Sequence, residues 1–247
     1  KYGKRLEEYR MRPDDFTDLY GQREVTKDKL LVDKIKSAET TKTERGELLE
    51  GIIMEQAEQS DWFGENSTLV SVSDYDDRNA HGDLVLELKG ADEKITRILI
   101  DVTTSVDETK LNEKLSNSLS LIKDKRLSNV KYFQSESEEF RGRLINIPRV
   151  VIGMSPYLLR ELCGEILEKK NQQENNPVQA VLLDQMESQL LTFWKLADSL
   201  HGESHEITKK LKVSYDIIRG ISAKKNSLRA HGYERKARDL TSRLLKY

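Results

Sequence analysis

The feature that most constrains the fold of this chain is a pair of aspartates set against apolar, strand-like segments. Asp83 opens the apolar run of HGDLVLELK, and Asp101 closes the apolar run of RILIDVTTS. A buried carboxylate is costly unless it is hydrogen-bonded, paired or bound to a cation. Two of them on neighbouring strands therefore indicate a polar site, and hard oxygen ligands of this kind favour a divalent cation.

Hydrophobic periodicity around the two aspartates predicts an α/β protein. Apolar residues at the helical period indicate a helix over 43–60, and alternating patterns indicate strands over 69–73, 83–89 and 95–104. The polar run 74–82 between the first two strands is expected to be a hairpin-like loop. A helix over 107–126, a buried strand over 149–155 and a helix that begins at Pro156 complete the predicted order.

Both ends of the chain read as helical and polar. Residues 1–42 form a lead-in that Pro13 interrupts, with a helix N-cap expected at Thr26 or Asp28. After the polar break that ends at Pro177 no strand is expected, and helices are predicted over 178–200, 206–225 and 233–246. The sequence thus predicts a helical lead-in (1–42), an α/β core (43–176) and an all-helical C-terminal region (177–247).

Charge is distributed unevenly along the 247 residues, whose net charge is −2. From Lys209 to Tyr247 there are twelve Lys and Arg against three acids, a net charge of +9, which leaves −11 for the remainder. A basic region of this kind can contact phosphate groups, or it can dock on the acidic body of its own protein. Both possibilities are open at this point.

The composition narrows the setting. No apolar run reaches transmembrane length, and the first residues lack the apolar stretch of a secretory signal. The single Cys163 cannot form an internal disulfide, and one Cys with four His does not suit a structural zinc site. We expect a cytoplasmic protein in a reducing compartment, with no membrane partner.

Strand parity groups the candidate polar residues. Asp101 and Thr103 lie two positions apart and therefore share one face of their strand, while Val102 points to the other face. Glu50 lies beside the apolar stripe of the first core helix. Simpler interpretations stay open, since Glu50 could be a solvated helix acid and Asp83 could close a turn after Gly82.

The order of elements and acids resembles the PD-(D/E)XK nuclease superfamily over about residues 43–169. The matching residues are Gly46 and Glu50 in the helix, Asp83 on the second strand, and Asp101, Val102 and Thr103 on the third. The resemblance implies a restriction-endonuclease-like αβββαβ core with a mixed sheet. It also implies Mg²⁺ or Mn²⁺ held by Asp83, Asp101, the peptide carbonyl of Val102 and Glu50.

One position departs from the family. Where the family usually has a lysine on the third strand, this chain has Thr103, which can hydrogen-bond a phosphate but carries no positive charge. Lys110 or Lys114, on the helix that follows, could reach back to supply that charge.

The sequence therefore predicts a metal-dependent nuclease that cuts nucleic acid, DNA more than RNA, and holds the backbone with its basic C-terminal helices. Two alternatives stay open. One is a catalytically inactive nuclease-like module that binds protein or DNA, and the other is a DNA-binding subunit whose partner chain performs the cleavage. A homodimer or a protein partner is compatible with each of them.

Overall fold

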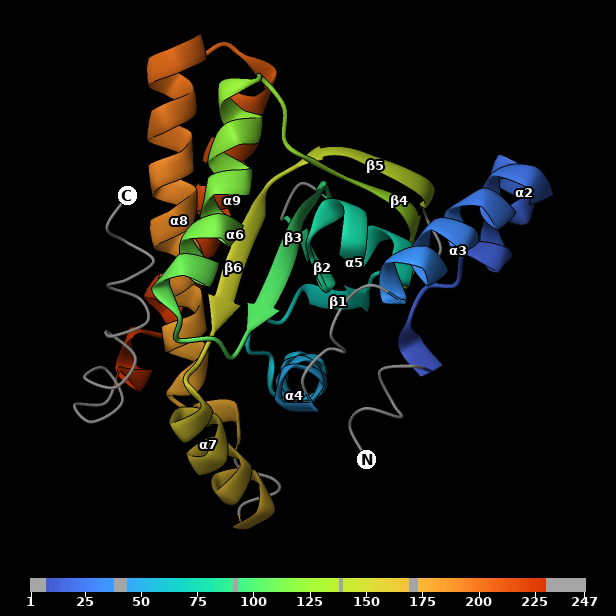
Figure 1. Ribbon diagram of the computed structural model, residues 1–247. Helices are drawn as coiled ribbons and strands as arrows, with labels where there is room; N and C mark the ends of the chain where they lie inside the picture. Colours follow the sequence, from blue (N-terminus) through green and yellow to red (C-terminus); the bar gives the residue numbers. More distant parts are fainter. Residues whose placement is uncertain (1–7, 38–43, 91–92, 138–139, 169–172, 230–247) are drawn as a thin grey trace.

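The computed structural model describes residues 8–37, 44–90, 93–137, 140–168 and 173–229. These residues contain eight α-helices, a mixed four-stranded sheet and a separate two-stranded hairpin (Figure 1). The sheet has the order β1-β2-β3-β6, from β1 (Ser67–Ser71), β2 (Leu84–Lys89), β3 (Ile95–Thr103) and β6 (Arg149–Gly153). The first three strands are antiparallel and β6 is parallel to β3, so the predicted α/β class and mixed sheet are confirmed.

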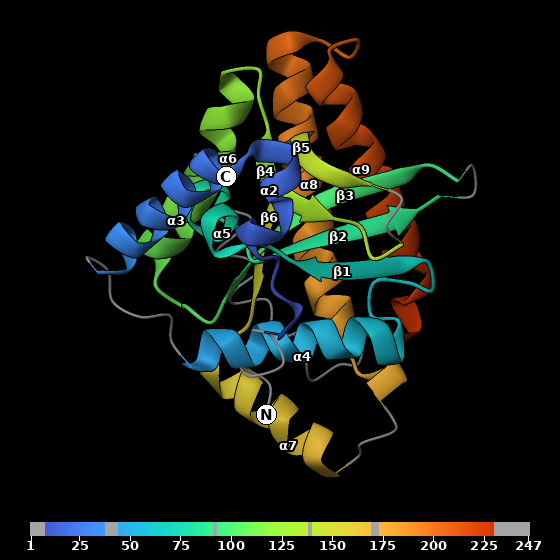
Figure 2. The same cartoon turned by 90° about the vertical axis from the view of Figure 1, so that its right-hand side faces the viewer.

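The helices surround this sheet. They are α4 (Glu44–Ser60), α6 (Glu108–Lys123), α7 (Pro156–Glu168), α8 (Val178–His201) and α9 (Glu206–Lys224), each close to its predicted range. Figure 2 shows α4 beneath β1, running roughly along the strand direction, with α8 and α9 side by side behind the strands. Beyond Pro177 the described residues contain no strand, as predicted, and the expected helix over 233–246 lies outside them. No described helix is long and apolar enough to cross a membrane.

The two faces of the sheet bury different cores. Leu86, Ile98 and Ile100 face a large core that includes residues of α4, α6, α7, α8 and α9. Val85 and Leu99 face a smaller core beneath the hairpin of β4 (Ser128–Gln134) and β5 (Arg141–Ile147). Because side chains alternate along a strand, Asp101 shares the face of Leu99 and lies on the hairpin side of the sheet.

The run 74–82 is not the hairpin-like loop that we predicted. It contains helix α5 (Asp74–Ala80), whose N-cap Ser73 accepts a hydrogen bond from the backbone N–H of Asp76. Three acids in the first turn of α5 favour the helix, because carboxylates stabilise the positive end of the helix dipole. The clustered aspartates, which we interpreted from the sequence as a loop, instead stabilise the start of this helix.

The hairpin β4–β5 is an addition to the predicted order, inserted between α6 and β6. Its strands carry charged residues among apolar ones, and two register irregularities interrupt their pairing. The alternation that would identify these strands in sequence is therefore broken. The hairpin covers the face of the sheet that carries Asp101.

The N-terminal segment consists of the 3-10 helix η1 (Pro13–Phe16), α2 (Thr17–Tyr20) and α3 (Gln22–Lys36). The N-cap predicted at Thr26 or Asp28 is wrong, because α3 already begins after Gly21, whose φ of 77° breaks the chain direction between α2 and α3. The segment docks on β4, where the rings of Phe16 and Tyr20 pack against Tyr132. Residues 1–7 and 38–42 of the predicted lead-in lie outside the described residues.

Strand β6 forms one edge of the sheet, and α8 covers that edge. The side-chain amide of Gln189 bonds both the N–H (2.8 Å) and the C=O (2.6 Å) of Val151, and Gln185 bonds Gly153 in the same way (2.9 Å each). Helix α8 therefore takes the place of a neighbouring strand. It also shares one apolar core with the sheet, and the domain boundary placed near Asn176 stays a prediction.

Candidate functional site

Asp101 lies at the centre of the sheet, on the strand that pairs with β2 on one side and β6 on the other. It is 2% exposed. The preceding apolar residues of β3 fix its position, because they bury the strand from both faces. A carboxylate at such a place requires positive or hydrogen-bonding partners.

Two cations meet the Asp101 carboxylate. The ammonium Nζ of Lys114, on α6, lies 2.5 Å from Oδ1, and Nη2 of Arg149 donates to Oδ2. Burial raises the pKa of Asp101 above its usual range, and the nearby carboxylate of Asp83 adds to this effect, while Lys114 and Arg149 oppose it. The carboxylate is therefore held in place by two positive charges against a desolvation cost.

The two cations differ in mobility. The side chain of Arg149 is buried and bonded on every side: Nε donates to the His81 carbonyl, and Nη1 donates to the Lys114 carbonyl (2.9 Å) and to Ser118 Oγ (3.1 Å). The side chain of Lys114 is 34% exposed and enters the site from the solvent side of α6. Arg149 is a fixed structural charge, whereas Lys114 is able to turn toward a ligand.

Asp83 stands one residue before β2 and is held by backbone pairing. Its N–H donates to the Ile100 carbonyl (2.8 Å), and its carbonyl accepts from the N–H of Val72 (3.0 Å). The Oδ2 of Asp83 accepts from the N–H of Val102 at 2.7 Å. This carboxylate is thereby fixed beside β3, next to Asp101, and Gly82 before it leaves room for the side chain of Leu99, which a Cβ would meet at 2.4 Å.

Glu50 is buried on α4, with 2% of its surface exposed. The sequence placed Glu50 beside the apolar stripe of its helix, and this position agrees with a side chain at the edge of the core. The burial is not that of a solvated helix acid. Arg10 of the N-terminal segment lies nearby, with Nη2 3.9 Å from Oε2 of Glu50, and also pairs with Asp74. No sequence pattern indicates this contact, because Arg10 lies in a lead-in without a strong periodicity.

One pocket of about 650 Å³ gathers the predicted residues. Glu50, Asp83, Asp101, Val102, Thr103, Lys110 and Lys114 all line it. Thr103 Oγ1 accepts from the N–H of Ser105 at 3.1 Å, which shapes the turn after β3. Lys110 stands one turn before Lys114 on α6 and faces the same opening.

Sequence reasoning missed Arg149 as a member of this site. The guanidinium of Arg149 lines the pocket and joins β6 to β3 and α6. A charged residue at the start of the apolar run RVVIG was the available signal, since a buried strand rarely begins with arginine unless the charge has a partner. His81, two residues before Asp83, also lines the pocket, and its sequence position is compatible with a general base, a phosphate contact or a loop histidine on the rim.

The pocket is acidic and suits a hard cation in part. Five carboxylates and three cationic side chains line it. Within the described residues, however, no three His, Cys, Asp or Glu side chains come together as a ready metal cage. Mg²⁺ usually keeps several waters and takes only one or two carboxylates, so Asp83 and Asp101 would suffice to hold it once Lys114 leaves Oδ1 of Asp101. The assignment of Glu50 and the Val102 carbonyl as further ligands stays a prediction.

The basic residues of the C-terminal region are largely engaged with the protein itself where the structure describes them. Lys210 pairs with Glu206 and Lys212 with Asp216, both within α9. Lys225 bonds the Asp61 carbonyl (2.5 Å) and Gln179, and Arg229 pairs with Asp184 on α8. The contacts of Lys225 and Arg229 with other elements favour docking on the rest of the protein as one role of the region.

We find no match to this chain among family models, curated proteins or solved structures.

Proposed function

We propose that this chain is a metal-dependent nuclease of the PD-(D/E)XK type that hydrolyses phosphodiester bonds in nucleic acid, with DNA the favoured substrate. The order of a helix, three antiparallel strands, a helix and a strand parallel to the third supports a restriction-endonuclease-like core. In this proposal the hairpin β4–β5 is an insertion into that core, and the basic C-terminal region adds contacts to the nucleic-acid backbone.

The single observation that carries the proposal is the position of Lys114. Its ammonium lies 2.5 Å from Asp101, in the pocket that also holds Asp83, and so supplies from α6 the charge that Thr103 cannot supply from β3. A lysine beside the two acids suits phosphodiester cleavage, because negative charge develops on the phosphate oxygens in the transition state.

Each side chain then has a distinct task. Bound Mg²⁺ or Mn²⁺ would neutralise the phosphate and lower the pKa of a water molecule. Asp83 and Asp101 would hold the ion, and Lys114 would turn from Asp101 toward a phosphate oxygen. Arg149 does not touch the substrate in this scheme but positions the carboxylate of Asp101 through its bond to Oδ2.

A second candidate is an inactive module with a nuclease-like core. One specific observation favours it, namely that both oxygens of Asp101 already meet cationic groups of the protein. In that case Lys114 and Arg149 would permanently occupy the position of the metal ion, and the pocket would bind nucleic acid or protein without cleavage.

Cleavage of labelled single- and double-stranded DNA and RNA, with Mg²⁺, Mn²⁺ or EDTA, tests the proposal. Wild type should cut at least one substrate only with the metal ion, and Asp101→Asn should abolish cleavage. We expect Lys114→Met to lower the rate by about 10² to 10³, the usual effect of removing one group that stabilises transition-state charge.

Matched controls separate chemistry from folding. Lys123→Met changes an exposed lysine in the last turn of the same helix, and Asp198→Asn changes an exposed acid near the end of α8. Both should cut at the wild-type rate. Absence of cleavage by folded wild type with every substrate and metal would reject the nuclease and leave the inactive module.

A further inference from the structure

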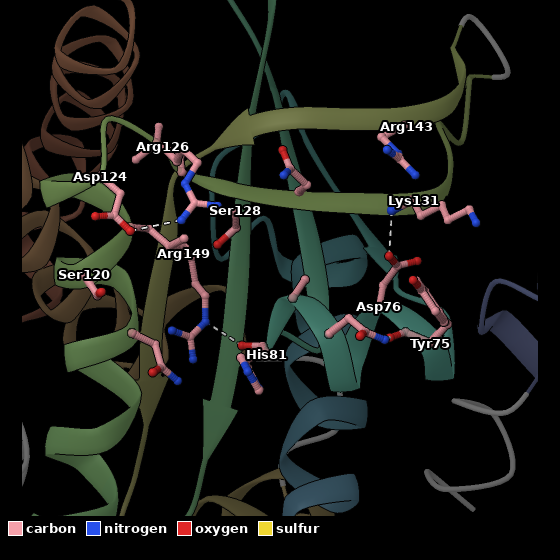
Figure 3. Close-up of a pocket in the computed structure, with 16 residues that line it drawn as sticks. Tyr75, Asp76, His81, Ser120, Asp124, Arg126, Ser128, Lys131, Arg143 and Arg149 are labelled. Atoms are coloured by element: carbon pink, nitrogen blue, oxygen red, sulfur yellow. Dashed lines mark hydrogen bonds and ion pairs between the residues drawn. The ribbon is translucent and has the colours of Figure 1, made fainter. Parts of the chain in front are cut away.

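A second pocket, of about 430 Å³, lies between α5 and α6 beneath the hairpin β4–β5. Figure 3 shows its walls: Tyr75, Asp76 and His81 come from the α5 side, Ser120 and Asp124 from the α6 side, and Arg143 from the hairpin above. Its volume falls within the range of small-molecule sites. The pocket holds none of the acids assigned to the candidate metal site.

The charges of the two pockets are opposite. Four cationic side chains and two carboxylates line the second pocket, whereas acids outnumber cations in the first. One carboxylate of the second pocket, Asp76, is buried and already accepts the backbone N–H groups of Lys131 (2.6 Å) and Tyr132 (2.9 Å). The second pocket is therefore less acidic than the first, and its capacity to hold an anion depends on those of its cations that are not already paired inside the protein.

Two of its cations are able to meet a ligand. Lys131 is buried against Asp28 and Glu24, and Arg149 is held by Asp101, so neither can move into the pocket. The guanidinium of Arg126 is solvent-exposed and contacts only the exposed carboxylate of Asp124 across 3.0 Å among the ion pairs described. Arg143 is exposed on β5, and Figure 3 places its guanidinium at the roof of the pocket.

The two pockets adjoin each other. His81, Asn117 and Arg149 line both of them, so groups of one extended ligand could occupy the two pockets side by side. Amide and hydroxyl groups of Asn117, Ser120 and Ser128 form the polar wall between the candidate metal site and the arginines. Such groups bind the sugar and base edges of nucleotides, and arginines bind phosphates.

We propose that this second pocket binds the nucleotides next to the phosphodiester that is cut, with one phosphate on Arg126, another on Arg143, and sugar and base groups along Asn117 and Ser120. The inference rests on the proposed nuclease function, which supplies a strand in the first pocket. It assigns the path of the substrate to the groove between α5 and α6.

Binding of fluorescein-labelled single- and double-stranded DNA and RNA oligonucleotides, measured in EDTA at a series of salt concentrations, tests this pocket without cleavage. The plot of log affinity against log salt has a negative slope, and each phosphate contact that is removed should make this slope shallower by about 1. The double variant Arg126→Gln with Arg143→Gln should therefore have a slope shallower by about 2. Arg160→Gln, which changes an exposed arginine on α7 away from the pocket, should leave the slope unchanged.

Three results would overturn the assignment of the second pocket as a nucleotide site. They are an unchanged salt slope in the double variant, an equal change of slope in Arg160→Gln, or no binding of any oligonucleotide by wild type at about 50 mM salt. The cleavage assay keeps this failure distinct from failure of the proposed function. Metal-dependent cleavage by wild type, with an unchanged salt slope in the double variant, rejects only the nucleotide site in the second pocket. A salt slope that becomes shallower by about 2 in the double variant, when wild type never cuts, supports the nucleotide site and rejects the nuclease.

Discussion

At the scale of single residues, the two cations on Asp101 should separate into a structural one and a functional one. Arg149→Met leaves a buried carboxylate with one partner fewer, and loss of a buried charge partner costs about 3 to 5 kcal/mol of unfolding free energy. Lys114→Met should cost about 1 kcal/mol or less, because that side chain is one-third exposed and its ion pair is screened by solvent. Urea denaturation of both variants, with Lys123→Met as the exposed control, measures the difference. Equal losses for Arg149→Met and Lys114→Met would contradict the assignment.

The pH dependence of metal binding also belongs to Asp101. Because its folded pKa is raised, the folded protein binds more protons than the unfolded chain, and this group's contribution to metal-free stability increases as pH falls through the folded pKa. Metal binding requires the ionised carboxylate, so the gain in melting temperature with Mn²⁺ should decrease over the same range, above the ordinary aspartate pKa of about 3.9. Thermal melting across pH measures both dependences, metal-free stability in EDTA and the gain in melting temperature with Mn²⁺. A gain in melting temperature with Mn²⁺ that persists in Asp101→Asn would show that the ion binds elsewhere.

The sequence identified the acids and lysines of the site, but not the partners that the fold brings to them. Asp101 interrupts an apolar strand, so its importance is visible in one segment alone. Arg149 and Arg10 act through partners that are distant in the chain, and only the fold brings them together. Lys114 lies between these cases, because its place on the helix after β3 made it a candidate together with Lys110, with Lys89 a weaker one.

At the scale of elements, the edge of the sheet is closed by side chains instead of a strand. Gln185 and Gln189 are one helical turn apart, about 6 Å along α8, which matches the spacing of about 6.6 Å between Val151 and Gly153 on β6. The sequence interpretation of 178–200 as an amphipathic helix could not show this match, because it depends on where α8 lies against β6. The same holds for the hairpin β4–β5, whose broken register hides its alternation.

Gln189→Leu should therefore destabilise the protein although it places an apolar side chain in an apolar core. The change leaves the buried N–H and C=O of Val151 without their amide partner, which costs about 1 to 3 kcal/mol for each unsatisfied group. Lys195→Leu, at an exposed position of the same helix, should change stability by about 0.5 kcal/mol or less. Urea denaturation compares the two, and a Gln189→Leu variant as stable as wild type would show that β6 does not need the amide of α8.

At the scale of the whole molecule, the N-terminal segment is part of the folded body and reaches the candidate site. Asp28 on α3 accepts from Lys131 Nζ (2.6 Å) and from the Tyr132 hydroxyl (2.7 Å), and the ammonium of Lys131 lies about 5 Å from three tyrosine rings. Burial opposes the charge of Lys131, but the bonds to Asp28 and Glu24 prevail and raise its pKa. The segment thus encloses a buried cation next to the second pocket, which the sequence, read as a polar lead-in, could not indicate.

Asp28→Asn should loosen this attachment. The neutral amide leaves the buried ammonium of Lys131 with Glu24 as its remaining carboxylate, and a buried charge that loses its partner costs about 3 to 5 kcal/mol. Asp33→Asn, an exposed acid on the same helix, is the matched control and should be neutral. Hydrogen exchange locates the effect: protection should fall in α3 and β4 while β3 and α8 keep theirs, because their core contains no residue of α3. Equal loss of protection throughout would mean that the segment and the sheet unfold as one unit, and no loss at all would mean that packing of Phe16 and Val25 holds the segment without the ion pair.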